Sequence, residues 1–121
     1  GGDFATAQAV CHRLVAIDEL NAGAHYVLAL CREDLGDRDG AIEQHRVAIY
    51  LDATFAMPRL HVGLLARRTG DLGLARRELG QALALLKHED VSRLLLFGGG
   101  FNRQSLIALC GSALRDCGEQ P

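Results

Sequence analysis

Small and apolar residues recur along this chain with one clear period. Shifting the sequence by 34 residues brings residues of the same kind together at six places. The matched pairs are Leu28 with Val62, Ala29 with Gly63, Gly36-Asp37 with Gly70-Asp71, Ala41 with Ala75, Ala48 with Ala82, and Leu51 with Leu85. The same register places Gly2-Asp3 at the corresponding turn, so we expect the chain to begin halfway through a repeating unit.

A period of 34 residues resembles the tetratricopeptide repeat, in which two antiparallel helices form one stacking unit. At each turn, Gly36 or Gly70 can take the left-handed backbone conformation that ends a helix. Asp37 or Asp71 can then accept hydrogen bonds from the free N–H groups of the next helix. The pattern predicts helices over residues 3–17, 22–35, 38–51, 56–69 and 72–86, with Asn21 and Thr54 as further N-caps.

Small side chains predict where the two helices of each hairpin approach one another, because they let the backbones pack closely. The expected contacts are Ala29 with Ala41 and Ala48, and Gly63 with Ala75 and Ala82. The chain departs from the family at His25 and Arg59, where a large aromatic residue is preferred, and at Ala53, where Pro is preferred. These departures concern detailed packing and leave the period intact.

The end of the chain predicts a cap. Asn102 can begin a helix from Arg103 to about Asp116, and a helical array must cover its last apolar face. One face of that helix carries Leu106, Leu109, Cys110, Ala113, Leu114 and Cys117. The predicted fold is all-α, a tetratricopeptide-repeat α-solenoid of antiparallel helix hairpins with a C-terminal capping helix. We expect a single domain over residues 1–121, with a half repeat (1–21), two repeats (22–55 and 56–89) and an atypical cap (90–121).

Composition narrows the range of partners. The net charge of -2 mixes both signs along the chain, so we expect no binding of nucleic acid, which needs a one-sided basic field. No apolar run approaches the ~20 residues of a membrane span, and no charged and apolar leader precedes residue 1. We therefore expect a cytoplasmic protein without membrane insertion.

Residues able to carry chemistry form no recognisable set. The cysteines contain no CxxC pair, so free buried thiols are expected, and the histidines show no zinc-ligand spacing. These residues are Cys11, Cys31, Cys110 and Cys117, and His12, His25, His45, His61 and His88. With no Ser/His/Asp or Cys/His arrangement visible either, we predict no catalytic residue, no metal and no cofactor.

One stretch imitates a cofactor site. An apolar segment and a glycine loop over residues 94–101, followed by a helix, is also how nucleotide and methyl-donor sites begin. Such folds need further strands and a crossover helix, whereas only twenty residues follow Phe101. The cofactor interpretation is therefore disfavoured.

The same stretch narrows the family. The sequence LLLFGGGFNR at 94–103, followed by LIALC at 106–110, resembles the end of CheR-type chemotaxis receptor methyltransferases that carry a C-terminal tetratricopeptide region. The resemblance implies an upstream methyltransferase domain, absent here, and a non-enzymatic scaffold that regulates or targets it. Its partner would be that domain, a chemoreceptor or another chemotaxis protein. The alternative is a purely structural or dimerisation module without a selective peptide site.

The tetratricopeptide resemblance also points to a binding surface, because the first helix of each repeat in that family lines a concave groove. The corresponding residues here are Tyr26, Val27, Leu30, Glu33, Asp34, Leu60, His61, Leu64, Arg67 and Arg68. Repeat proteins that grip a C-terminal carboxylate carry Lys and Asn where this chain has Tyr26, Leu30, Leu60 and Leu64, which disfavours a chaperone-tail clamp. The arginines Arg67-Arg68, with Arg76-Arg77 nearby, either hold an acidic peptide or form a solvated face.

An apolar strip on the first helices would need a cover, since soluble monomers rarely expose large apolar patches. The nearest candidates are Leu94, Leu95, Leu96, Phe97 and Phe101, acting either as an intramolecular plug in the groove or as a cap at the end of the stack. In both cases Phe97 and Phe101 are expected to be mostly buried.

Overall fold

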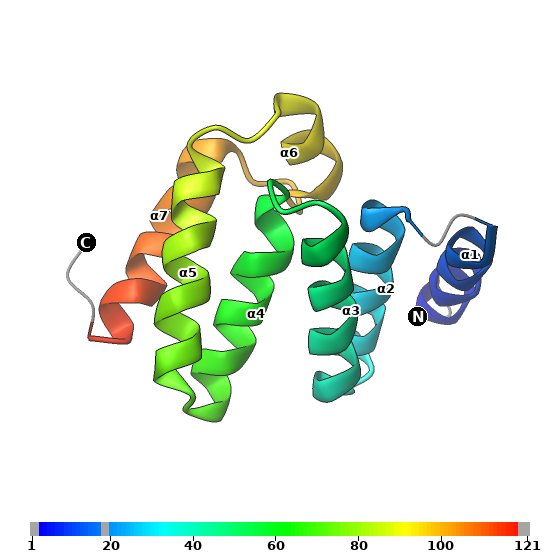
Figure 1. Ribbon diagram of the computed structural model, residues 1–121, viewed down its shortest axis with the longest axis horizontal. Helices are drawn as coiled ribbons and strands as arrows, with labels where there is room; N and C mark the ends of the chain where they lie inside the picture. The colour runs from blue at the N-terminus through cyan, green and yellow to red at the C-terminus, as the bar shows by residue number, and fades with distance from the viewer. Residues whose placement is uncertain (1–2, 18–19, 119–121) are drawn as a thin grey trace. The chain divides into compact units, whose positions relative to one another are not determined.

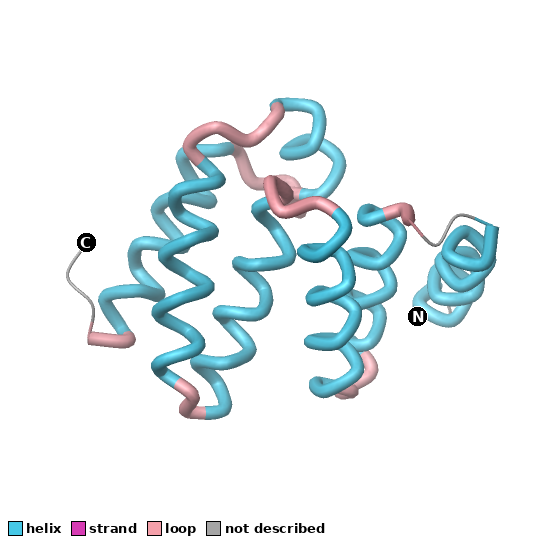
Figure 2. Tube along the Cα trace, in the orientation of Figure 1, coloured by secondary structure: helices cyan, strands magenta, loops and turns pink. Residues whose placement is uncertain are grey.

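The chain folds into helices joined by short turns (Figure 1). The computed structural model describes residues 3–17 and 20–118, and in these residues it contains seven helices and no strand (Figure 2). The helices are α1 (Asp3–Ile17), α2 (Ala22–Asp34), α3 (Arg38–Leu51), α4 (Ala56–Thr69), α5 (Leu72–Leu86), α6 (Val91–Phe97) and α7 (Arg103–Asp116). Within this part of the chain, no helix combines the length and the apolar character that a membrane span requires.

Helix positions follow the predictions closely. The predicted bounds of α1, α3, α4, α5 and α7 are confirmed, and α2 ends at Asp34, one residue earlier than predicted. The apolar part of the segment that imitates a cofactor site is helical, as α6, and is not a strand. The strand that leads into the glycine loop of a cofactor site is therefore not formed by this segment.

The two glycine–aspartate turns work as predicted. Gly36 and Gly70 have φ values of 80° and 85°, in the left-handed region that glycine enters without a steric cost. The Asp37 side chain accepts a hydrogen bond from the Gly40 N–H, and the Asp71 side chain accepts one from the Leu74 N–H. Each turn therefore ends one helix and begins the next within a few residues.

The residues predicted to lie between paired helices are fully buried. Ala29, Ala41, Ala48, Ala75 and Ala82 have no exposed surface. At Gly63, a Cβ atom would approach the Cγ atom of Leu79 to 2.6 Å, so α4 and α5 meet more closely than even an alanine would allow. The absence of a side chain at Gly63 is thus a requirement of the α4–α5 hairpin.

The chain divides into two compact units between Ala53 and Thr54. In unit 1, α1 packs against α2, and α2 pairs with α3. In unit 2, α4 pairs with α5, and α7 packs against α5. The Cys110 thiol on α7 donates a hydrogen bond to the carbonyl oxygen of Leu79, 3.0 Å away, which ties the last helix to the hairpin.

The predicted N-caps are confirmed at Asn21 and Asn102, whose side chains accept hydrogen bonds from the N–H groups of Ala24 and Ser105. The prediction of Thr54 as the cap of α4 is wrong. The N-cap of α4 is Phe55, which has no oxygen to offer, and the buried carboxylate of Glu89 accepts a hydrogen bond from the Ala56 N–H at 2.8 Å instead. A residue distant in sequence thus supplies the acceptor, and its negative charge suits the positive end of the helix dipole.

Candidate protein-interaction surfaces

On α2, the side chains predicted to line a groove differ in how far they reach the surface. Tyr26 is 1% exposed and belongs to the core of the fold. Val27, Leu30 and Glu33 are half-buried, and Asp34 is exposed. The accessible part of this helix therefore joins apolar side chains in its middle to carboxylates at its C-terminal end.

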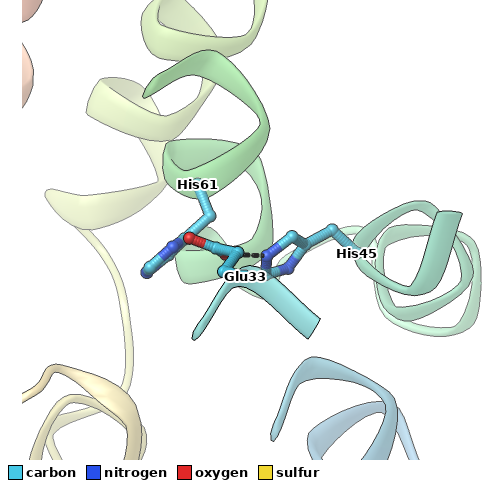
Figure 3. A group of neighbouring side chains, drawn as sticks. All are labelled: Glu33, His45 and His61. Atoms are coloured by element: carbon cyan, nitrogen blue, oxygen red, sulfur yellow. Dashed lines mark hydrogen bonds and ion pairs between the residues drawn. The ribbon is translucent and has the colours of Figure 1, made fainter. Parts of the chain in front are cut away.

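A buried histidine on α3 contacts two of the predicted groove residues of α2. The Nε2 atom of His45, on α3, lies 2.7 Å from the Oε2 atom of Glu33, and Figure 3 shows this contact as a dashed line. The His45 ring is fully buried and lies 5.5 Å from the Tyr26 ring, centroid to centroid. Burial, and then the charge of Glu33, raise the pKa of Tyr26, so this phenol is neutral at neutral pH.

On α4, the pattern of exposure is similar. Leu60 is 1% exposed, His61 and Leu64 are half-buried, and Arg67 and Arg68 lie in the last turn. Arg68 is exposed, whereas Arg67 is half-buried. The accessible part of α4 thus presents Leu64 and, at its C-terminal end, two positive charges. The C-terminal end of α2 presents two negative charges instead.

The end of α7 contacts Arg67 of α4 and Arg76 of α5. The Nη1 atom of Arg67 lies 2.9 Å from the Oδ2 atom of Asp116, and Arg76 donates a hydrogen bond to the carbonyl oxygen of Cys117 at 3.1 Å. A cation is favoured at this position because the last carbonyl groups of a helix carry the negative end of its dipole. Arg67 and Arg76 thereby hold the last turn of α7 against α4 and α5.

The segment expected to act as plug or cap is mostly exposed. Leu94 is 7% exposed and Phe97 is half-buried against Phe55, with ring centroids 5.1 Å apart. Leu95 and Leu96 are 80% and 74% exposed. The expectation that Phe101 would be mostly buried is wrong, because 59% of it is exposed. The plug or cap role itself stays a prediction.

Two of these exposed side chains, those of Leu95 and Phe101, border a shallow pocket of about 250 Å³ between α6 and the start of α7. It is lined by Val91, Leu94, Leu95, Gly100, Phe101, Asn102 and Arg103. Arg103 is anchored below it, since its guanidinium donates hydrogen bonds to the carbonyl oxygens of Leu86 and Glu89. Val91 was not singled out from the sequence, although an apolar residue at the start of a short helix beside a glycine loop was a usable signal.

A second anchor fixes α6 to the start of α4. Arg93 stacks 4.7 Å above the Phe55 ring and donates hydrogen bonds to Glu89 and to the hydroxyl oxygen of Thr54. Glu89 in turn accepts the Ala56 N–H, so one buried carboxylate joins two helices. Sequence reasoning missed Glu89 because nothing in its local pattern distinguishes it from the charged residues around it.

The thiols have the character of core residues. Cys11, Cys31, Cys110 and Cys117 are buried and form no disulfide. Burial raises the pKa of Cys110 to about 11, and it also raises the pKa values of Cys11 and Cys31. A buried thiol with a raised pKa is a poor nucleophile, so Cys11, Cys31 and Cys110 contribute packing.

Comparisons with known proteins agree on the fold. No protein-family model matches the chain, and no curated protein matches it either. Among solved structures, PcrH in complex with the chaperone-binding region of PopD is 21% identical, with a TM-score of 0.80 over 97% of this chain and 80% of PcrH. The type III secretion translocator chaperone SycD of Yersinia enterocolitica is 20% identical, with a TM-score of 0.80 over 97% of this chain and 73% of SycD.

A third neighbour is more distant. MamA is 18% identical, with a TM-score of 0.65 over 94% of this chain and 62% of MamA. Identities this low show a shared fold alone. The predicted all-α fold of tetratricopeptide-type helix hairpins is confirmed, and a specific relationship to CheR-type proteins is not among the similarities found.

Proposed function

We propose that this chain is a protein-interaction module, in which the accessible face of the first helix of each unit binds a partner protein. The observation that supports this most strongly is that each first helix keeps at least one apolar side chain that is only half-buried. Val27 and Leu30 on α2, and Leu64 on α4, remain partly accessible although neighbouring positions on the same helices are fully buried. Such side chains gain free energy when a partner covers them.

The fold of the neighbours supports the same proposal. PcrH was solved with a region of PopD, and SycD with a peptide of the translocator YopD. These are complexes of chaperones with segments of other proteins. By analogy of fold, we infer that the groove residues of each unit contact a segment of another protein, with apolar contacts in the middle of the first helix and charged contacts at its C-terminal end.

For the partner, we propose a CheR-type chemotaxis receptor methyltransferase, or a chemoreceptor on which it acts. This rests on the resemblance of the sequence at 94–110 to the end of such enzymes. The chain would regulate or target the methyl transfer, and the proposal gives it no catalytic step, no cofactor and no metal. A cytoplasmic location would follow from such a partner.

Isothermal titration calorimetry tests this proposal with two ligands, the catalytic domain of a CheR-type methyltransferase and a chemoreceptor peptide containing the methylated glutamates. We expect one of them to bind, and the double variant Leu30→Ser, Leu64→Ser to bind about tenfold more weakly. Tyr50→Ser is the matched control, because Tyr50 is 88% exposed on the second helix of its hairpin. Failure of both ligands to bind would refute the chemotaxis partner, and equal effects of the two variants would refute the surface.

A structural or dimerisation module is the second candidate, and the exposed side chains of α6 favour it. Leu95 and Leu96 are adjacent and exposed by 80% and 74%, which is unusual for a surface that nothing covers. Sedimentation velocity over a range of concentrations tests this candidate. A dimer that is lost in Leu95→Lys but kept in Leu35→Lys, at a position 63% exposed in unit 1, would support it. A monomer at all concentrations would exclude it.

A further inference from the structure

Positive charge in unit 2 gathers at the end where α4 stops, α5 starts and α7 stops (Figure 1). We call this region the arginine end and define it as Arg67 and Arg68 of α4, and Arg76 and Arg77 of α5. Two of the four arginines converge on consecutive residues of the chain, since Arg67 contacts the Asp116 carboxylate and Arg76 contacts the Cys117 carbonyl oxygen. Both guanidinium groups therefore contact the C-terminal end of α7.

The net charge of the whole chain does not reveal that positive charge is concentrated in unit 2. Residues 1–53 contain nine Asp and Glu against four Arg, whereas residues 54–121 contain six Asp and Glu against nine Arg and Lys. The net charges of the two units are thus -5 and +3, although the sum is only -2. An acidic ligand is attracted to unit 2 and repelled by unit 1, which gives such a ligand one preferred place on the chain.

The difference in charge between the two units is also found at individual equivalent positions of the 34-residue repeat. Positions that carry Glu33, Asp34 and Glu43 in the α2–α3 hairpin carry Arg67, Arg68 and Arg77 in the α4–α5 hairpin. Because the hairpins share their turn geometry, the same places on the scaffold present opposite charges. General solubility requires no such reversal, whereas discrimination between ligands of opposite charge does.

One carboxylate of the chain already occupies the arginine end. Asp116 binds Arg67 at 2.9 Å, and the side chains of this ion pair are 63% and 33% exposed. Exposed pairs of this kind contribute at most about 1 kcal/mol. The contact therefore demonstrates that a carboxylate fits, and a competing carboxylate displaces it at small cost.

We propose that the arginine end binds a carboxylate-rich segment of a partner protein, with an incoming carboxylate replacing Asp116 on Arg67. This rests on the proposed function as a protein-interaction module and names the chemistry of its ligand. A protein segment is favoured over nucleic acid because Asp71 and Asp116 lie at the same end and repel a continuous phosphate backbone. Separate carboxylates can avoid these two acids and still pair with the guanidinium groups.

Fluorescence anisotropy with a fluorescein-labelled octaglutamate peptide tests the proposal. We expect saturable binding at low salt that weakens as salt rises. The double variant Arg67→Glu, Arg68→Glu should raise Kd by about tenfold or more. The matched control is Arg38→Glu, Arg46→Glu, which changes the net charge equally at two exposed positions of unit 1 and should leave Kd within about twofold.

Asp116→Asn keeps the proposal falsifiable if the double variant folds poorly. Removing the internal competitor frees Arg67, so we expect Asp116→Asn to bind octaglutamate about threefold more tightly than the natural chain. Weaker or unchanged binding by Asp116→Asn would overturn the displacement step. A mere loss of folded structure cannot produce tighter binding.

Two further results would overturn the proposal as a whole. One is the absence of octaglutamate binding, and the other is equal competition by a thymidine oligonucleotide, which would make the surface a general polyanion site. The proposed function is tested separately by Leu30 and Leu64. If the methyltransferase domain binds but octaglutamate does not, only this inference fails, and the opposite result would leave the arginine end as a site without the proposed partner.

Discussion

The α2–α3 and α4–α5 hairpins share one backbone design and differ in the side chains built on it. Both turn through a left-handed glycine followed by a capping aspartate, and both bury alanines between their helices. Even a bridging pair is retained, because His25 contacts Gln44 at 2.8 Å and the equivalent Arg59 contacts Glu78 at 2.9 Å. The geometry is therefore set by small residues and turns, which leaves the remaining positions free to diverge in chemistry.

The divergence extends into the core. Position 45 is a buried histidine bound to Glu33, whereas the equivalent position 79 is a buried leucine packed against Gly63. The equivalent of Glu33 is Arg67, which has a leucine and not a histidine at position 79 of its hairpin and contacts Asp116 on α7. The two hairpins thus differ together at two positions. The hairpin with His45 in its core has an acidic residue near the end of its first helix, and the hairpin with Leu79 has a basic one.

Exchanging these two core residues should give the largest effect. Leu79→His places a polar ring at a fully buried position, against a glycine that leaves no spare space. We expect a loss of about 3–4 kcal/mol in the free energy of unfolding, measured by urea denaturation. His45→Leu should cost less than about 1 kcal/mol, because Glu33 is half-buried and keeps contact with water. Equal losses would show that the two cores are not chemically distinct.

Removing the N-terminal caps of α4 and α2 should give the second-largest loss of stability. Glu89 is 6% exposed and accepts hydrogen bonds from the Ala56 N–H and from Arg93, so Glu89→Ala should destabilise the protein by about 2–3 kcal/mol. Asn21→Ala removes a local cap from α2 and should cost about 1 kcal/mol. Thermal denaturation followed by circular dichroism ranks the two variants. A smaller loss for Glu89→Ala would mean that the distant cap matters less than its burial indicates.

Alkaline pH should destabilise the protein through the buried thiol of Cys110 in unit 2. Burial raises the pKa of Cys110 to about 11, whereas an unfolded thiol titrates near 8.5. Since the folded pKa is the higher one, the stabilisation is complete below about pH 8.5 and is lost as the pH rises through about 11. We expect the natural chain to lose about 3 kcal/mol more than Cys110→Ser between these limits.

Denaturation under a reducing agent at several pH values measures this difference, and the reducing agent keeps all four thiols free of disulfides. Serine keeps a hydrogen-bond donor for the carbonyl oxygen of Leu79 but does not titrate in this range. Parallel pH profiles of the two proteins would contradict the raised pKa.

Much of the fold was readable from the sequence because its signals are local. The Gly-Asp turns and the 34-residue spacing of small residues predicted the bounds of α1 to α5 to within a residue. The cap of α4 was not readable, because Glu89 lies 33 residues from the N–H that it accepts. Phe101 was wrongly expected to be buried, since apolar character alone does not decide whether neighbours cover a side chain.

The candidate surface was readable only in part. Sequence placed charged residues at the ends of the first helices, but the contact between Arg67 and Asp116 joins residues 49 positions apart. The opposite charges of the two units were missed because charge was summed over the whole chain. Counting charge by repeat, in the 34-residue register, exposes the reversal at Glu33 and Arg67 without any structure.

The central claim is that two hairpins of one backbone design present surfaces of opposite charge. Its most direct test is chemical-shift mapping by NMR. The ¹⁵N-labelled chain is titrated in turn with octaglutamate and with octalysine. Octaglutamate should shift the amides around Arg67 and Arg68 and leave those around Glu33 and Asp34 unchanged, while octalysine should do the reverse. Shifts of the same amides by both peptides, or of neither set by either, would contradict the claim.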